Sequence, residues 1–288
     1  MTTAVAGLSG RTLRFAEVVP SADGPALRRL GAADFDLDAE RAVFETGDPE
    51  AIEAVAEALA AGLGGTAAEA LVVAAHPTAT TSFFSRLPVG LAPEARLGQI
   101  HQETALLADL APTQAVRVRA RSVRVEPAAG GDREWVHVVH VAEPVHARLS
   151  LLADALGVGG YDVADSTRAA AVVAGPGLAL VVGAFRGHTE VAVAHDGTFL
   201  FGTHGPSTAP ADTAYFALAA LQQAGAEAGA LDRLWVYGDD ATNDRLDLTA
   251  EFVGAEAAWL DPFGPFRRRP DADAGELAAF APVLGAAL

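Results

Sequence analysis

The sequence predicts an α/β fold built from two units that repeat the same order of elements. In each unit a meander of short strands is followed by an amphipathic helix and then by a short, continuously apolar segment. Strands that alternate with helices are typical of layered α/β folds, and a short apolar run is typical of a parallel strand buried on both faces. The chain has 288 residues, of which 51% are hydrophobic, so it can form one large or two medium domains.

The first unit begins with predicted strands over residues 11–19 and 26–35. A helix follows, for which Asp48 is the predicted N-cap and Pro49 the first helical residue. Its apolar residues recur at the i, i+3, i+4 spacing of one helical face: Ile52, Val55, Ala56, Leu59 and Leu63. Residues 71–75 are the predicted buried strand of this unit.

The second unit repeats this order. Its meander covers residues 178–203, where apolar residues alternate on both sides of the hairpin signal Asp196-Gly197. A helix over residues 210–223 follows, and residues 234–237 form the buried strand. The helix residues predicted to face the core are Tyr215, Leu218 and Leu221.

Two more helices are predicted after this strand, one from Thr242 and one from about Gly275. The second carries apolar residues on one face: Leu277, Phe280, Ala281 and Leu284. We expect it to return toward the first unit. The predicted domains are residues 1–165 and 166–288.

The material between the units contains helices over residues 93–107 and from Pro144, and a central strand over residues 135–141. It also contains a strand over residues 116–125 with one solvated face, because three arginines alternate there with apolar residues. These arginines are Arg117, Arg119 and Arg121. We expect residues 108–133 to form a subdomain inserted into the first domain.

Composition limits the partners of this chain. The net charge is −17, which disfavours binding to nucleic acid or to an anionic membrane, although codon usage or adaptation to salt also produces acidic proteins. The absence of cysteine excludes disulfides, thiolate metal sites and a cysteine nucleophile. The N-terminus lacks the pattern of a signal peptide, and Gly175-Pro176-Gly177 interrupts the longest uncharged run. We therefore expect a cytoplasmic protein without direct membrane insertion.

Five segments, in this order, resemble those of the actin-like pilus assembly family, whose members include PilM and the cytoplasmic part of the secretion protein GspL. They are AVAGLSGRTLRFAEV at residues 4–18, LVVAAHPTATTSFFSRLPVGLAPEARLGQIHQETALL at 71–107, WVHVVHVAEPVHARLSLLADALGV at 135–158, LVVGAFRGHTEVAVAHDGTFLF at 180–201 and LWVYGDDATNDRLDLTAEFVGAEAAWLDPF at 234–263. The resemblance implies an actin-like ATPase (ribonuclease H-like) fold. In that fold two duplicated α/β domains with mixed sheets flank a nucleotide cleft.

The resemblance also points to the residues of that cleft. Each phosphate hairpin of the family begins with Asp-x-Gly, whose Asp acts through Mg²⁺-bound water. Here Gly7 and Ser9 occupy these positions in the first hairpin, and Gly183 and Phe185 in the second. With both Asp residues replaced, we expect no Mg²⁺-dependent ATP hydrolysis, no catalytic residue and no bound cofactor; retained ATP–Mg²⁺ binding is the disfavoured alternative.

The remaining residues matched to the cleft are Gly238 and Asp239 in the adenosine loop, where the family usually has Gly-Gly. Arg186, His188 and Thr189 of the second hairpin could hold an anion, and the alternative is that they are solvated turn residues. No metal site is predicted, because three-residue spacing on a strand places His137 and His140 on opposite faces.

The resemblance implies function through protein contacts. In the family, a short tail of a membrane-anchored partner docks on the globular protein, and oligomers form. We therefore expect a non-catalytic scaffold in a type IV pilus or type II secretion-like assembly, peripheral to the inner membrane and able to form a homo-oligomer. The stripe of Arg117, Arg119 and Arg121 could bind an acidic partner, or could be a solvated face paired with carboxylates. A divergent nucleotide or sugar-phosphate binding protein or kinase, and a stand-alone protein of the same fold, are the alternatives.

Overall fold

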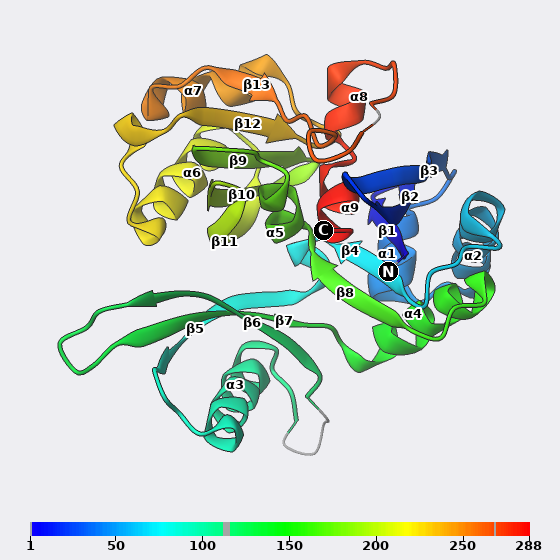
Figure 1. The fold of residues 1–288 in the computed structure, drawn as a ribbon, viewed down its shortest axis with the longest axis horizontal. Coiled ribbons are helices and arrows are strands. Elements are labelled where there is room, and N and C mark those ends of the chain that lie inside the picture. The colour runs from blue at the N-terminus through cyan, green and yellow to red at the C-terminus, as the bar shows by residue number, and fades with distance from the viewer. Residues whose placement is uncertain (1, 112–115, 268) are drawn as a thin grey trace.

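The computed structural model describes residues 2–111, 116–267 and 269–288, and Figure 1 shows two α/β halves with a smaller sheet beside them. The first sheet has the order β3-β2-β1-β4-β8 and the second the order β11-β10-β9-β12-β13. In each, an antiparallel three-stranded meander continues into two parallel strands. The predicted α/β fold with two duplicated, mixed-sheet domains is therefore confirmed.

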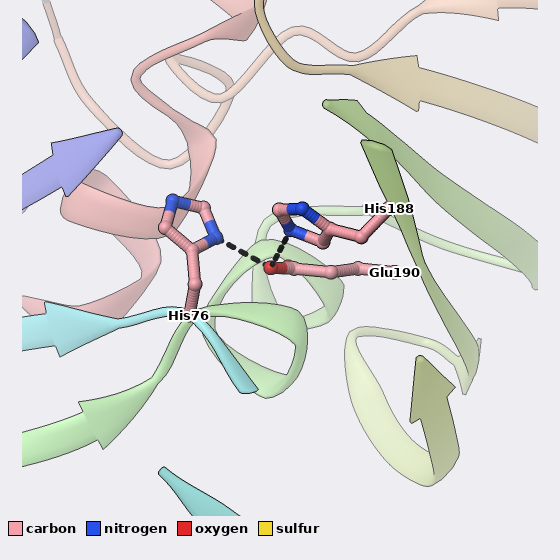
Figure 2. Close-up of side chains that lie close together, drawn as sticks. All are labelled: His76, His188 and Glu190. Carbon is pink, nitrogen blue, oxygen red and sulfur yellow. Dashed lines mark hydrogen bonds and ion pairs between the residues drawn. The ribbon is translucent and has the colours of Figure 1, made fainter. Parts of the chain in front are cut away.

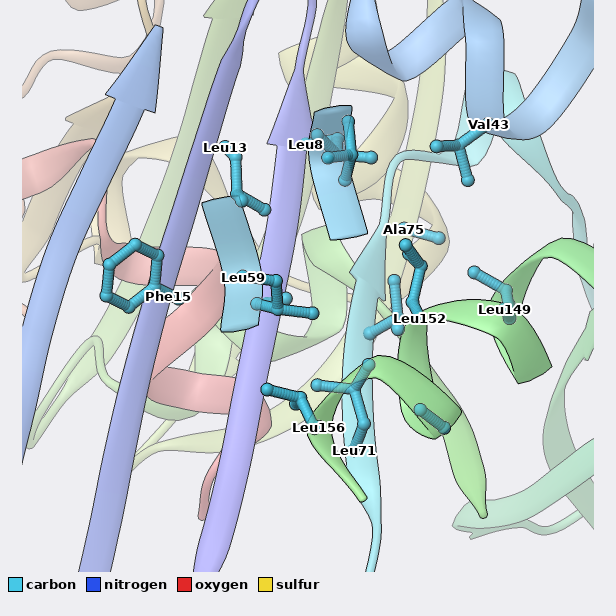
Figure 3. Packing of buried hydrophobic residues seen from close by; sticks show 14 of the residues in the cluster. Leu8, Leu13, Phe15, Val43, Leu59, Leu71, Ala75, Leu149, Leu152 and Leu156 are labelled. Atoms are coloured by element: carbon cyan, nitrogen blue, oxygen red, sulfur yellow. The ribbon is translucent and has the colours of Figure 1, made fainter. Parts of the chain in front are cut away.

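The first sheet carries helices on both faces. Its strands are β1 (Thr3–Ser9), β2 (Thr12–Ser21), β3 (Gly24–Asp34), β4 (Leu71–Ala75) and β8 (Tyr161–Asp165). One face packs against α2 (Pro49–Leu63) and α4 (Glu143–Leu156), where Leu59, Leu71 and Leu152 meet in one buried cluster (Figure 3). Helix α2 begins as predicted, because the Asp48 side chain accepts a hydrogen bond from the Glu50 amide at 3.1 Å.

A short segment that the sequence did not predict, α1 (Ala39–Arg41) followed by η1 (Ala42–Thr46), leads into α2. Strand β8 was likewise not predicted. It pairs in parallel with β4 and completes the edge of the first sheet.

The second sheet is arranged in the same way. Its strands are β9 (Leu178–Phe185), β10 (Gly187–His195), β11 (Thr198–Ser207), β12 (Arg233–Tyr237) and β13 (Ala257–Trp259). Helices α6 (Pro210–Ala224) and α7 (Asn243–Val253) contribute to the core on one face, and η3 (Ala228–Ala230) precedes β12.

Two predictions about helices need correction. In α6 the buried side chains are Thr213, Ala214, Ala217, Ala220 and Leu221, whereas Tyr215 and Leu218 are 68% and 38% exposed. Small residues face the sheet because the helix packs closely on it. The predicted closing helix is instead two short helices, α8 (Ala274–Ala278) and α9 (Ala281–Ala286), and Pro282 lies in the first turn of α9.

Helices α5 (Ser166–Val172) and α9 pack against each other between the two halves (Figure 1). Helix α9 also contacts β1, β2 and β4, so the C-terminus returns to the first sheet. A side chain at Gly285 would overlap the carbonyl oxygen of Ala169, so the close crossing of α5 and α9 requires glycine there.

A third sheet, of order β5-β7-β6, lies apart from the other two with α3 (Pro93–Leu107) against it (Figure 1). Its strands are β5 (Thr81–Pro88), β6 (Val118–Glu126) and β7 (Arg133–His140), and η2 (Pro77–Ala79) leads into β5. This sheet extends well beyond residues 108–133, because it includes β5 and β7, and no strand was predicted at β5. Phe84 of β5 stacks on Phe201 of β11 with ring centroids 4.7 Å apart, which joins the third sheet to the second half.

Candidate functional site

A cleft of about 680 Å³ lies between the two hairpins that resemble phosphate-binding turns. It is bordered by the β1–β2 turn, the α1–η1 segment, the β9–β10 turn and the loop after β12. Of the residues predicted for the cleft, four line it: Ser9, Arg186, His188 and Asp239. The other four, Gly7, Gly183, Thr189 and Gly238, are not among its lining residues.

Interactions within the protein occupy several polar groups of this cleft. The Ser9 hydroxyl donates to the Asp239 carboxylate at 2.6 Å, and the Arg14 guanidinium binds the same carboxylate at 2.5 Å. The Gly10 amide, at the turn of the first hairpin, donates to Glu40 at 2.8 Å. An anion in the cleft would therefore compete with two carboxylates of the chain itself.

The space beside both replaced Asp positions is filled. A Cβ at Gly7 would lie 2.9 Å from Val283 Cγ2 of α9. A Cβ at Gly183 would lie 2.5 Å from the Tyr237 ring. Neither position can carry a carboxylate unless these neighbours move.

Thr189 and Gly238 have structural roles. The buried Thr189 hydroxyl donates to the Gly183 carbonyl at 3.0 Å. Gly238 has φ of +103°, and a side chain there would overlap the backbone of Ala184.

Sequence reasoning missed a buried cluster around Glu190 on β10. One carboxylate oxygen, Oε1, contacts His76 Nδ1 and lies 3.5 Å from His188 Nε2 (Figure 2). The other, Oε2, accepts hydrogen bonds from Ser166 at 2.8 Å, Thr167 at 3.1 Å and Tyr237 at 2.7 Å. The first sheet contributes His76, which follows β4, and α5 contributes the two hydroxyls. The cluster therefore connects the two halves.

Charge separation in this cluster shifts the pKa values of its members. Burial alone would lower the pKa of His76, but the adjacent Glu190 carboxylate, together with Glu40 and Asp239, outweighs burial and raises that pKa to about 9. Burial alone would raise the pKa of Glu190, but His76 and His188 hold it far below its usual value. Burial, followed by the Glu190 charge, raises the pKa of Tyr237 well above 10. Near neutral pH the carboxylate is ionised and Tyr237 stays protonated as its donor.

A sequence signal for this cluster exists. Glu190 directly precedes the apolar run 191–194, and a charge in a strand that is buried on both faces needs partners. His76 directly follows the buried strand β4, at the end where parallel strands commonly present functional residues.

The predicted arginine stripe lies at a second cavity, of about 380 Å³, between β6 and the β8–α4 region. Arg117 pairs with Glu143 at 3.5 Å, and Arg119 pairs with Asp162 and donates to the Val163 carbonyl at 3.1 Å. Apolar side chains also line this cavity: Val118, Val139, Val141, Tyr161 and Val163. We call it the β6–β8 groove. Arg121 points to a small neighbouring hollow, where burial, and then Arg119, lower its pKa.

The β6–β8 groove lies between two sheet edges. In the described part of the chain, β6 is the last strand of the third sheet and β8 the last strand of the first. Such edges can accept an additional strand.

Comparison with known proteins identifies the fold. No protein-family model matches the sequence, and no curated protein matches it. Among solved structures, one described as a PilM–PilN type IV pilus biogenesis complex aligns with 14% identity and a TM-score of 0.69, covering 99% of this chain and 97% of that one. A protein of unknown function with an actin-like ATPase fold, from Bacteroides thetaiotaomicron, aligns with 12% identity and a TM-score of 0.51, covering 89% and 90%.

The chain thus has the actin-like ATPase fold, as the sequence motifs indicated. Among the described residues, no helix combines the length and the apolar character needed to cross a bilayer.

Proposed function

We propose that this chain is a non-catalytic actin-like scaffold that acts through protein contacts in a pilus or secretion-type envelope assembly. The observation that carries the proposal is that both positions of the phosphate-hairpin Asp are glycines whose neighbouring space is filled, by Val283 at Gly7 and by Tyr237 at Gly183. Phosphoryl transfer needs a positioned metal and a pocket that stabilises negative charge. Val283 and Tyr237 occupy the space that the metal-directing carboxylates would need.

The charges of the cleft support the same conclusion. Four carboxylates border it, from Asp38, Glu40, Glu45 and Asp239, against three guanidinium groups, from Arg11, Arg41 and Arg186. A nucleoside triphosphate would enter next to these carboxylates, and the backbone donor of Gly10 is already bound to Glu40.

The β6–β8 groove is the partner site in this proposal. Main-chain groups of an extended partner segment would pair with a sheet edge, and apolar side chains of the segment would lie against Val118, Val139 and Tyr161. Arg117 and Arg119 favour an acidic residue in that segment. A similar fold in a complex described as PilM–PilN supports a protein partner. The partner would be anchored in the membrane. This chain would be a peripheral subunit on the cytoplasmic side, and it would form a homo-oligomer.

An assay of ATP hydrolysis tests the proposal that the chain is non-catalytic. Purified protein should give no ATP hydrolysis above background with Mg²⁺, and Asp239→Asn should give the same result. Stoichiometric turnover that disappears in Asp239→Asn would overturn the proposal, because that carboxylate lies in the cleft.

Site-specific crosslinking in the native host tests the proposal that the β6–β8 groove binds a protein partner. A photo-crosslinking residue at Val118, which lines the β6–β8 groove, should capture one membrane-anchored protein. The matched control is Val125, which is exposed on the same strand and does not line this groove. Equal capture at both positions, or none at Val118, would count against the groove. The genes next to this one would separate an assembly component from a stand-alone protein of the same fold.

A divergent nucleotide or sugar-phosphate binding protein is the second candidate. Its support is the size of the cleft and the presence of Arg186 and His188 on one wall. It predicts that ATP–Mg²⁺ or an anionic sugar raises the melting temperature, and that Arg186→Ala abolishes the rise. No shift across a broad panel of such ligands would exclude it.

A further inference from the structure

The three side chains that meet at Glu190 have the chemistry and spacing of metal ligands. His76 Nδ1, His188 Nε2 and Glu190 Oε1 all lie within 4.8 Å of one another (Figure 2). The 3.5 Å between His188 Nε2 and Glu190 Oε1 matches the separation of two ligands on a tetrahedral ion, about 3.4 Å for bonds of about 2.1 Å. His76 Nδ1 contacts the same oxygen more closely, so an ion would replace the shared proton and draw these two atoms apart.

Strand geometry explains why two of these ligands converge. His188 and Glu190 are two residues apart on β10, and residues at this spacing point to the same face of a strand. Thr189, between them, instead donates to the Gly183 carbonyl. His76 reaches the same point from the end of β4 in the first sheet.

Surrounding hydroxyls hold the carboxylate in the orientation that a metal ligand needs. Ser166, Thr167 and Tyr237 all donate to Oε2, which leaves Oε1 directed toward the two imidazoles. Hydrogen bonds of this kind orient ligating carboxylates in metalloproteins, and their loss weakens metal binding about 10–100-fold.

The donor set selects the class of metal. Two imidazole nitrogens and one carboxylate oxygen suit zinc and its neighbours, whereas Mg²⁺ and Ca²⁺ prefer oxygen ligands throughout. Three protein ligands leave one position of a tetrahedral ion open. His188 also borders the cleft, together with Phe185 and Asp239, so the open position would face that cleft.

We propose that His76, His188 and Glu190 bind one zinc-class divalent ion, which joins the two halves of the fold and presents an open coordination position to the cleft. Water or an oxygen of a small anion from the cleft would complete the coordination. This inference does not depend on the proposed scaffold function, because a metal clasp between the halves is compatible with a catalytic or a non-catalytic protein.

Titration with Co²⁺ tests the proposal, because this ion reports tetrahedral coordination through its visible absorption. Full-length protein is first treated with a chelator, and Zn²⁺ is then used to displace bound Co²⁺. We expect one Co²⁺ per chain, intense absorption, and full displacement by one equivalent of Zn²⁺. Zn²⁺ should also raise the melting temperature. No stoichiometric binding of Zn²⁺ or Co²⁺ to the full-length chain would overturn the site.

Substitutions of single histidines test which residues bind the ion. His188→Ala should weaken binding at least tenfold and remove the Zn²⁺-dependent rise in melting temperature. The matched control is His195→Ala, an exposed histidine at the other end of the same strand, which should bind as the parent does. Equal affinity in His188→Ala and the parent, or loss of binding in His195→Ala, would refute the assignment.

A second variant covers the case in which His188→Ala does not fold. Tyr237→Phe keeps all three ligands and removes one hydrogen bond to Glu190, so it should weaken Zn²⁺ binding about 10–100-fold. Unchanged affinity in a folded Tyr237→Phe protein would contradict the proposed orientation of the carboxylate.

Discussion

At the scale of single residues, the two hairpin glycines leave space that Val283 and Tyr237 fill. The Tyr237 ring lies where a side chain at position 183 would project, and its hydroxyl group donates to Glu190 at 2.7 Å. A carboxylate at position 183 would therefore collide with the ring and lie close to the ionised Glu190. Tyr237 thus links the glycine at position 183 to the Glu190 cluster.

Restoring the carboxylate should consequently damage the fold without restoring nucleotide binding. Gly183→Asp should lower the free energy of unfolding by about 3 kcal/mol or more, through overpacking and an unpaired buried charge. Urea denaturation measures this change. Gly130→Asp is the control, because a side chain there meets no atom within 4 Å, and its effect should stay within about 0.5 kcal/mol. A Gly183→Asp protein of parental stability that binds ATP–Mg²⁺ would contradict this account.

A second residue-scale prediction concerns pH. His137 is buried and in hydrogen-bonding contact with Ser82 at 2.8 Å, and burial lowers its pKa although Asp165 acts in the opposite direction. The unfolded chain therefore binds a proton at this histidine at a pH where the folded chain does not. The contribution of neutral His137 to stability is present above about pH 6.5 and is lost as the pH falls below it.

Comparison of the parent protein with His137→Gln between pH 5.5 and 7.5 measures this effect. Below pH 6.5 the parent should lose stability relative to the variant, by at most about 1.4 kcal/mol per pH unit. If the two curves of unfolding free energy against pH are parallel, the protonation of His137 does not change when the chain unfolds.

From the sequence, only some residues of the cleft and of the Glu190 cluster could be predicted. The family motif located Ser9, Arg186, His188 and Asp239, because they lie on turns whose position follows from local hairpin signals. It could not locate His76 or the hydroxyl of Tyr237, because their roles depend on contacts with Glu190 across 114 and 47 residues. The isolated charge of Glu190 in an apolar strand was the signal available.

At the scale of elements, the sequence correctly predicted those helices and strands that depend on interactions between neighbouring residues. The N-cap Asp48 and the run at residues 71–75 each placed an element correctly. Strand β5 was missed because it exists through pairing with β7, about 50 residues later in the chain. The buried face of α6 was predicted wrongly because large apolar side chains were expected to be buried. The close packing of this helix on the sheet instead favours alanine.

The crossing of α5 and α9 gives an element-scale prediction. Gly285→Ala should lower the free energy of unfolding by about 2 kcal/mol or more, because the new methyl group would meet the rigid backbone of Ala169. Gly98→Ala in α3 is the matched control, since nothing lies within 4 Å of a Cβ there and alanine favours the helix by about 1 kcal/mol. Chemical denaturation should therefore show changes of opposite sign. A stabilised Gly285→Ala protein would mean that the helices can separate at little cost.

At the scale of the whole molecule, the fold consists of two similar halves that are joined by several contacts. These contacts include the α5–α9 crossing, the Phe84–Phe201 stack, the Glu190 cluster, the Arg14–Asp239 bridge and the buried cluster that joins Phe263 and Phe266 to Val18. For a scaffold, the spacing between the halves determines the surface presented to a partner. In an active ATPase of this fold, the nucleotide itself would lie between the halves. Here Val283 and Tyr237 fill the space beside the two hairpin glycines, while a cleft of about 680 Å³ remains between the hairpins.

The Arg14–Asp239 bridge offers a test of this arrangement, because it joins the first half to a residue of the second half that lines the cleft. Arg14 lies on β2 of the first half, and Asp239 follows β12 of the second. Arg14→Ala should loosen the halves and increase amide hydrogen exchange at both sides of the cleft, in residues 9–12 and 238–242. The matched control is Arg11→Ala, which removes a bridge to Asp36 within the first half and should leave exchange near residue 239 unchanged. Equal exchange in the two variants would mean that the Arg14–Asp239 bridge contributes little to holding the halves together.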